Sequence, residues 1–220
     1  MVQNLKMTRV LITACILTFA VASAIFFPVA KLAIGKARAD RLSAIYSHGL
    51  RACGLGTDEF DQLVSTHLPE KAATRITRWP AFSERAQVIA IGSEHLYYIE
   101  FDPAYRHEKK ALTLNIKGIP KISMSEISVR TSQELVKLLL GDTHNAPKDA
   151  PMNSIDGAGY EFKAIDGVCA VTNSPDPGSR AGKLLDLYTL LVEHVGLKTS
   201  NDLQKSDDAI FSAASALIVE

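Results

Sequence analysis

The feature that most constrains this chain is an uncharged, predominantly apolar run at residues 10–30, close to its N-terminus. A helix rises about 1.5 Å per residue, so a run of this length spans about 30 Å, the thickness of the hydrocarbon core of a bilayer. We interpret residues 10–30 as a transmembrane helix or signal anchor that follows a short tail at residues 1–9. The rest of the chain is then delivered to a membrane or across it.

A cleaved secretory signal is the alternative interpretation of the same segment. Lys6 and Arg9 provide a basic start, and Ala22-Ser23-Ala24 has the small-x-small pattern of a cleavage site. The chain nevertheless stays apolar from Ile25 to Ala30, which is longer than a cleaved signal needs. Secretion after cleavage near Ala24 is therefore the second interpretation.

The orientation follows from the flanks of the apolar run. Lys and Arg residues lie on both sides of it, so the positive-inside rule does not decide between the two orientations. The tail of residues 1–9 is typical of a signal anchor that leaves the bulk of the chain outside. We therefore expect an extracytoplasmic, periplasmic body on a single-pass membrane anchor.

The charge of the body argues against a nucleic-acid partner. The first 41 residues hold six of the 24 basic residues and one of the 24 acidic residues. Residues 42–220 therefore carry 18 basic and 23 acidic side chains, a net charge of −5. Binding to a phosphate backbone depends on clustered Lys and Arg, which this mildly acidic body lacks. The basic residues at 31–41 suit anionic lipid headgroups beside the anchor instead.

Local patterns predict helices at the start of the body. Residues 31–56 are predicted as a juxtamembrane helix, with Leu50 and Cys53 on its apolar stripe. Thr57 is predicted to cap a second helix that ends near Leu68. A short helix is predicted for residues 70–78.

Strand signals dominate the middle of the chain. Residues 87–91 and 96–101 flank a short polar turn and predict a hairpin. Alternation of apolar and polar residues at 112–117 predicts a strand, and Ile127 with Val129 suggests another. Asp166-Gly167 joins two further apolar runs and predicts a hairpin with a type I′ turn.

Three more helices complete the prediction. A capping box that starts at Thr131 opens a helix that Gly141 is expected to end, with a long loop from there to Gly159. Further helices are predicted at residues 179–195 and 206–218. Strands joined by short turns between helices predict a single α+β domain at residues 57–220, with an antiparallel sheet packed by helices.

Ser179, Arg180 and Lys183 form a weak candidate site for a small anionic ligand. They open a predicted helix after a strand, where free backbone N–H groups can bind an anion. Gly182-Lys183 resembles part of a phosphate-binding loop, but the glycine spacing is too short and Leu184 replaces the Ser or Thr that binds magnesium.

The cysteines allow two interpretations. Cys169 and His194 occur in the order of a thiol catalyst, the weaker interpretation, because no orienting Asn or Asp is identifiable. The stronger interpretation pairs Cys169 with Cys53, the other cysteine outside the apolar run, in a disulfide that suits an exported body. The six histidines show no metal-ligand spacing, so the sequence predicts no metal and no cofactor, with surface or boundary histidines throughout.

Together these patterns predict a non-catalytic, membrane-anchored domain that acts as an interaction or assembly component of the cell envelope. Its partners are then the membrane, through residues 10–30, and another protein of the envelope. An extracytoplasmic domain that binds a small anion is the alternative, followed by a thiol-dependent enzyme. A flat apolar patch would favour the protein partner, whereas a pocket with convergent polar groups would favour the other two.

The anchor leads to the first prediction. We expect the mature chain to retain residues 10–30, because apolar sequence continues beyond Ala24. Intact-mass analysis should find the full-length chain in an alkali-resistant membrane fraction. A soluble mature protein that begins at Ile25 would contradict this.

Overall fold

The structure is a computed structural model that describes part of the chain. The described residues are 36, 49–53, 64, 66–68, 74–79, 85–108, 111–148 and 158–219, without the side chains of 103–118. The chain divides into two units, Met1–Ala44 and Ile45–Glu220, and the sheet and helices below belong to the second. Among the described residues, no helix has the length and apolarity needed to cross a bilayer. The predicted membrane segment at 10–30 lies outside them.

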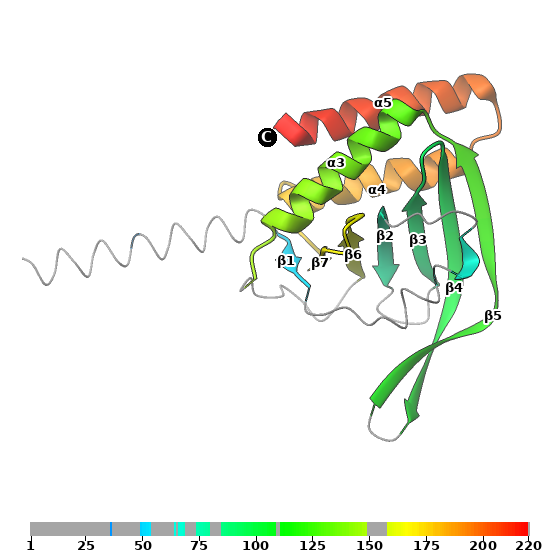
Figure 1. Ribbon diagram of the computed structural model, residues 1–220, viewed down its shortest axis with the longest axis vertical. Coiled ribbons are helices and arrows are strands. Elements are labelled where there is room, and N and C mark those ends of the chain that lie inside the picture. Colours follow the sequence, from blue (N-terminus) through cyan, green and yellow to red (C-terminus); the bar gives the residue numbers. More distant parts are fainter. Residues whose placement is uncertain are drawn as a thin grey trace, which may run out of the picture. The chain divides into compact units, whose positions relative to one another are not determined.

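The second unit is built on one antiparallel sheet of seven strands (Figure 1). Its spatial order is β1-β7-β6-β2-β3-β4-β5, and every neighbouring pair is antiparallel. The strands are β1 Arg51–Ala52, β2 Thr74–Trp79, β3 Ala86–Ile91, β4 His95–Glu108, β5 Ala111–Glu126, β6 Gly159–Lys163 and β7 Cys169–Asn173. The edges of the sheet among the described elements are therefore β1 and β5.

Three helices of the described part cover one face of this sheet. They are α3 Val129–Asn145, α4 Arg180–Gly196 and α5 Ser200–Val219. Helices α3 and α4 contact the strands, and α5 packs on α3 and α4 (Figure 1). The core between the layers joins apolar side chains of the sheet to those of the helices, among them Ile76, Ile89, Phe162, Leu139 and Leu187. This arrangement confirms the α+β class with an antiparallel sheet packed by helices.

The opposite face of the sheet has a smaller apolar cluster. Val88, Ile99 and Phe101 lie in it with Val64, and Leu68 and Trp79 pack against them. Val64, Thr66 and His67 are helical, in agreement with the helix predicted to begin at Thr57; the other residues of that helix lie outside the described part.

Both predicted hairpins are present. In the first, β3 pairs with β4, and Ile89 faces Tyr98. In the second, β6 pairs with β7, but the predicted type I′ turn is wrong. A type I′ turn needs a positive φ at both central residues, and Gly167 has one, +87°. Asp166 does not, because Ser174 is the only described residue other than glycine with a positive φ. The N–H of Gly167 donates to the carbonyl of Ala164 at 3.0 Å, as in a type I turn followed by a glycine bulge.

The predicted juxtamembrane helix at 31–56 is wrong at its C-terminal end. Gly49 has a φ of +66°, which a right-handed helix excludes, and strand β1 follows at Arg51–Ala52. A side chain at Gly49 would contact Ser179 and Ala181, so the chain turns here against the start of α4. Leu50 is buried in the core, but as part of an extended segment rather than of a helical stripe.

The short helix predicted at 70–78 is also wrong, because Thr74–Trp79 forms strand β2 between β3 and β6. Buried and exposed residues do not alternate along β2, since the residues from Thr74 to Thr77 are all buried. Arg75 is one of these, and its Nη2 lies 3.6 Å from Oε1 of Glu161 on β6. A strand buried on both faces loses the alternation that identifies strands in sequence.

The boundaries of α3 and α5 differ from the prediction. Ser128, rather than Thr131, is the N-cap of α3, and its hydroxyl accepts the N–H of Thr131 at 3.2 Å. The strand suggested by Ile127 and Val129 is therefore wrong. Helix α3 continues through Gly141 to Asn145, which shortens the predicted loop. Helix α5 begins at Ser200 instead of Ser206, whereas α4 matches its prediction closely.

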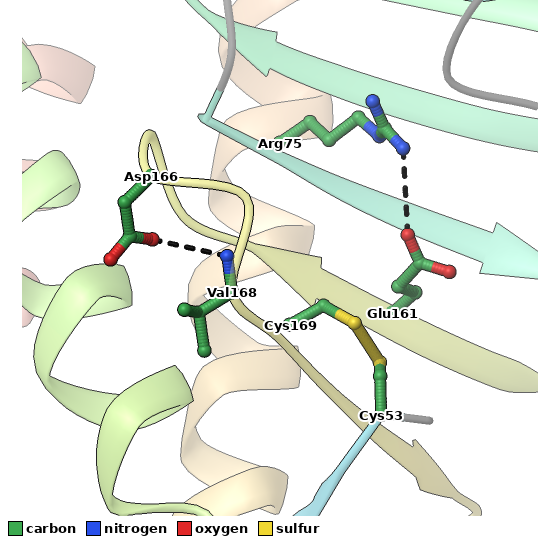
Figure 2. Close-up of a disulfide and its surroundings, with 6 residues drawn as sticks. All are labelled: Cys53, Arg75, Glu161, Asp166, Val168 and Cys169. Atoms are coloured by element: carbon green, nitrogen blue, oxygen red, sulfur yellow. Dashed lines mark hydrogen bonds and ion pairs between the residues drawn. A yellow bond between two sulfur atoms is a disulfide. The ribbon is translucent and has the colours of Figure 1, made fainter. Parts of the chain in front are cut away.

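A disulfide joins Cys53 to Cys169 beside the β1 edge (Figure 2). Their Cα atoms are 5.3 Å apart, and the N–H of Cys53 donates to the carbonyl of Cys169 at 3.0 Å. Strand β1 pairs with β7 over only two residues, Arg51 and Ala52. The bond therefore attaches this short edge strand covalently to the sheet.

The disulfide leads to a prediction about stability. Replacing both Cys53 and Cys169 by Ser should lower the free energy of unfolding by about 2 to 4 kcal/mol, because the bond closes a long loop in the unfolded chain. Urea unfolding with and without reductant measures this, and only the wild type should respond to reductant. Quantitative thiol labelling of both residues in protein from its native compartment would contradict the bond.

Candidate functional site

Ser179, Arg180 and Lys183 lie together at the start of α4, and Ser179 and Arg180 make hydrogen bonds within the protein. The Ser179 hydroxyl accepts the N–H of Gly182 at 3.0 Å and donates to the carbonyl of Asp176 at 2.6 Å. A side chain at Gly182 would overlap the carbonyl oxygens of Asp176 and Pro177. Close packing of the preceding loop therefore explains this glycine, and the loop groups nearest to it include two carbonyl oxygens, which repel anions.

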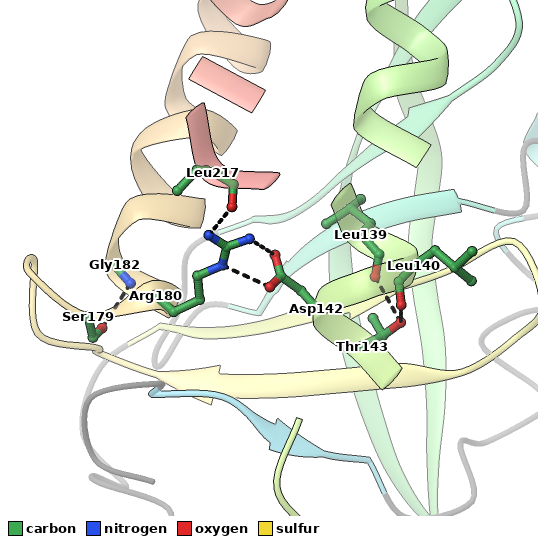
Figure 3. A network of polar contacts seen from close by, with 8 residues as sticks. All are labelled: Leu139, Leu140, Asp142, Thr143, Ser179, Arg180, Gly182 and Leu217. Carbon is green, nitrogen blue, oxygen red and sulfur yellow. Dashed lines mark hydrogen bonds and ion pairs between the residues drawn. The ribbon is translucent and has the colours of Figure 1, made fainter. Parts of the chain in front are cut away.

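Arg180 on α4 is hydrogen-bonded to both α3 and α5 (Figure 3). Its Nε donates to Oδ1 of Asp142 on α3 at 2.8 Å, and its Nη2 donates to Oδ2 of the same carboxylate at 3.1 Å. Its Nη1 donates to the carbonyl of Leu217 in the last turn of α5. This planar, two-point pairing neutralises the guanidinium and fixes its direction. A cation at the C-terminus of α5 also interacts favourably with the negative end of that helix's dipole.

A groove of 680 Å³ lies beside this ion pair, between the last turns of α3 and α5 and the start of α4. Lys137 on α3 and Lys183 on α4 contribute cationic side chains to it, and Asp142 contributes the carboxylate bound to Arg180. Of the predicted anion-binding residues, Arg180 and Lys183 line the groove, whereas Ser179 is 6 % exposed and caps the helix.

The structure does not bring Cys169 and His194 together. Cys169 lies on β7, in the disulfide, whereas Nε2 of His194 hydrogen-bonds to the carbonyl of Glu126 on β5 at 2.7 Å. Strands β7 and β5 are separated by β6, β2, β3 and β4. At about 4.8 Å between neighbouring strands, this places the two residues near opposite edges of the sheet. The thiol catalyst considered from the sequence is therefore wrong.

His194 also corrects the expectation of surface or boundary histidines, because it is fully buried. Because the Glu126 carbonyl accepts a hydrogen bond, Nε2 carries the proton. Nδ1 is buried without a hydrogen-bond partner in the structure. His194 is in the last turn of α4, and its helical position on the face that packs against the sheet explains its burial.

His144 and Asp166 form an exposed pair that the sequence did not indicate. Nε2 of His144, in the last turn of α3, lies 2.5 Å from Oδ2 of Asp166 in the β6–β7 turn. This hydrogen bond, with a second from the N–H of Val168, holds the pKa of Asp166 below its usual range. The pair therefore favours the folded state at neutral pH, and that contribution disappears as the pH falls through the lowered pKa.

Exposed apolar side chains lie at the β5 edge. Ile119, Ile122 and Met124 on this strand are 96 %, 45 % and 57 % exposed. The sequence carries a signal for them, since Ile122 and Met124 alternate with Ser123 and Ser125 as in a half-buried strand. That pattern alone does not reveal that the strand is at an edge with its apolar side chains uncovered.

Neither metal-ligand clusters among the described residues nor similarity to known proteins assigns a function to these residues. Among the described residues, no three His, Cys, Asp or Glu side chains are grouped in a way that could hold a metal ion. No family model, curated protein or solved structure matches the chain. The described part is an α+β domain. A disulfide holds one edge strand of its sheet, and apolar side chains are exposed on the other edge strand.

Arg180 leads to a prediction that separates packing from ligand binding. Arg180→Ala should lower the free energy of unfolding by about 3 kcal/mol, because it leaves the buried Asp142 carboxylate unpaired. Lys183→Ala is the matched control and should lower the free energy of unfolding by less, because Lys183 is only partly buried. Phosphate should raise the melting temperatures of wild type and Lys183→Ala equally, as a general salt effect. Stabilisation by phosphate that disappears in Lys183→Ala would instead support the anion site.

Proposed function

We propose that this chain is a non-catalytic interaction component of the cell envelope. In this proposal residues 10–30 anchor it in the membrane, and the α+β domain lies on the extracytoplasmic side. The observation that carries the proposal is the exposed apolar row on β5 made of Ile122 and Met124, which share one face of the strand; the exposed Ile119 lies in the bulge beside them. Grouped apolar side chains at a surface are typical of protein–protein contact sites.

The position of this row at a sheet edge strengthens the argument. An edge strand presents backbone N–H and C=O groups that another strand can pair with, so it offers hydrogen bonds as well as apolar contact. The disulfide between Cys53 and Cys169 is in keeping with the proposed location, since disulfides persist in oxidising, extracytoplasmic compartments.

The anion-binding alternative depends on the groove beside Arg180. Lys137 and Lys183 are the groups there that favour an anion. The paired state of Arg180 and the capping role of Ser179 make this the second candidate.

Site-specific photocrosslinking in living cells tests the proposed function. A photoreactive residue in place of Met124 should yield covalent adducts with an envelope protein, because this exposed side chain lies within the proposed contact. The same residue in place of Ile165, which is 59 % exposed in the β6–β7 turn, is the matched control and should yield none. Equal adducts at both positions, or none at Met124, would contradict the proposal.

A further inference from the structure

The two edges of the sheet differ in length and in protection. Strand β1 has two residues and is held by the disulfide, whereas β5 runs from Ala111 to Glu126. Among the described strands, β5 pairs only with β4. Pairing with β3 ends at Phe101, and beyond it β4 and β5 continue as a two-stranded ribbon (Figure 1).

A bulge divides β5 into two parts. Lys117 faces Asp102 and Lys121 faces Glu100, so Gly118, Ile119 and Pro120 are left opposite the single residue between these partners. Such a bulge twists a strand, and Pro120 has no N–H to offer, so this point discourages pairing. From Lys121 to Glu126 the strand is regular, which leaves six consecutive residues suited to a further strand.

The apolar layer on one face continues to this edge and is then uncovered. Ile122 lies opposite Ile99, and Met124 lies opposite Tyr97. Ile99 and Tyr97 are both only 2 % exposed, whereas their partners on β5 are about half exposed. Directly opposite residues of an antiparallel pair share a face, so a strand added beside β5 would extend this layer by one more row.

We propose that the occupant of this edge is a second copy of the chain, with the two β5 strands paired antiparallel about a two-fold axis at Ser123. This inference rests on the proposed function, because it names one partner of the interaction surface. A two-fold axis perpendicular to the sheet keeps equivalent side chains on the same face of the joined sheet. It also places each residue before Ser123 opposite the residue equally far beyond it in the other copy.

In this register the apolar side chains of the two β5 strands face one another. Ile122 of each copy faces Met124 of the other, which brings four apolar side chains together on one face. Lys121 then faces Ser125, so no like charges are opposed. An axis one residue earlier would set Met124 against Pro120, and an axis one residue later would set Ile122 against the charged Glu126. Paired apolar side chains of this kind stabilise a sheet, whereas opposed like charges destabilise it.

The oligomeric state of the full chain, purified in mild detergent, tests the pairing. Light scattering during size-exclusion chromatography should find a dimer for the wild type and a monomer for Ile122→Lys/Met124→Lys. Both substituted positions are solvent-exposed, so the variant should keep its circular dichroism spectrum. Ile165→Lys places a lysine on an exposed apolar residue elsewhere and should remain dimeric. A monomeric wild type, or a dimer that survives the double substitution, would overturn the proposal.

Disulfide trapping tests the register. In a background with Cys15→Ser, Ser123→Cys should form an intermolecular disulfide on mild oxidation, because a residue on the axis faces itself at a distance of about 4.5 to 5.5 Å between Cβ atoms. Ser212→Cys on the exposed side of α5 is the control and should stay monomeric on a non-reducing gel. Absence of the Ser123→Cys crosslink would overturn this register.

The two proposals fail in different ways. A monomeric wild type that still forms Met124-dependent adducts with other envelope proteins would overturn self-pairing and leave the proposed interaction function standing. A chain that is monomeric and forms no such adducts would overturn both.

Discussion

An open β-sheet has two edges with unpaired backbone groups, and the structure depends on how each edge is protected from further pairing. One edge is β1, a two-residue strand held to β7 by the disulfide between Cys53 and Cys169. The N–H of Ala52 also donates to the carbonyl of Pro147, so the chain that follows α3 contributes to this edge. The other edge, β5, is long and carries exposed apolar side chains. The proposed interaction therefore uses β5, because covalent and hydrogen bonds already hold the β1 side.

The layer of helices depends on a different interaction. Helix α5 packs on α3 and α4 rather than on the sheet, so its position requires contacts between helices. Arg180 supplies one of these, since its guanidinium bridges Asp142 on α3 and the carbonyl of Leu217 on α5. Part of the sequence beside Arg180 resembles a phosphate-binding loop, yet Gly182 serves close packing and Arg180 serves a buried ion pair. The same residue types satisfy both roles, and only the neighbours distinguish them.

The elements that the sequence predicted correctly are those whose signals are local. The β3–β4 and β6–β7 hairpins follow from apolar runs around short polar turns, and α4 follows from an apolar stripe with helical spacing. The elements it missed depend on distant partners. Strand β2 is buried on both faces between β3 and β6, and β1 exists because β7 lies beside it. In both segments local helical spacing was outweighed by hydrogen bonds to residues far along the chain.

The sequence by itself determined the apolar run at 10–30, the α+β class and the choice of Cys53 and Cys169 as the pair available outside that run. These depend on composition, on periodicity and on the number of cysteines, none of which needs a folded partner. Only the tertiary structure decided that Arg180 is bound to Asp142, that His194 is remote from Cys169, and that Ile122 and Met124 lie uncovered at an edge. Strand order decides the last two of these, because it sets which residues become neighbours and which described strands have a neighbour on one side only.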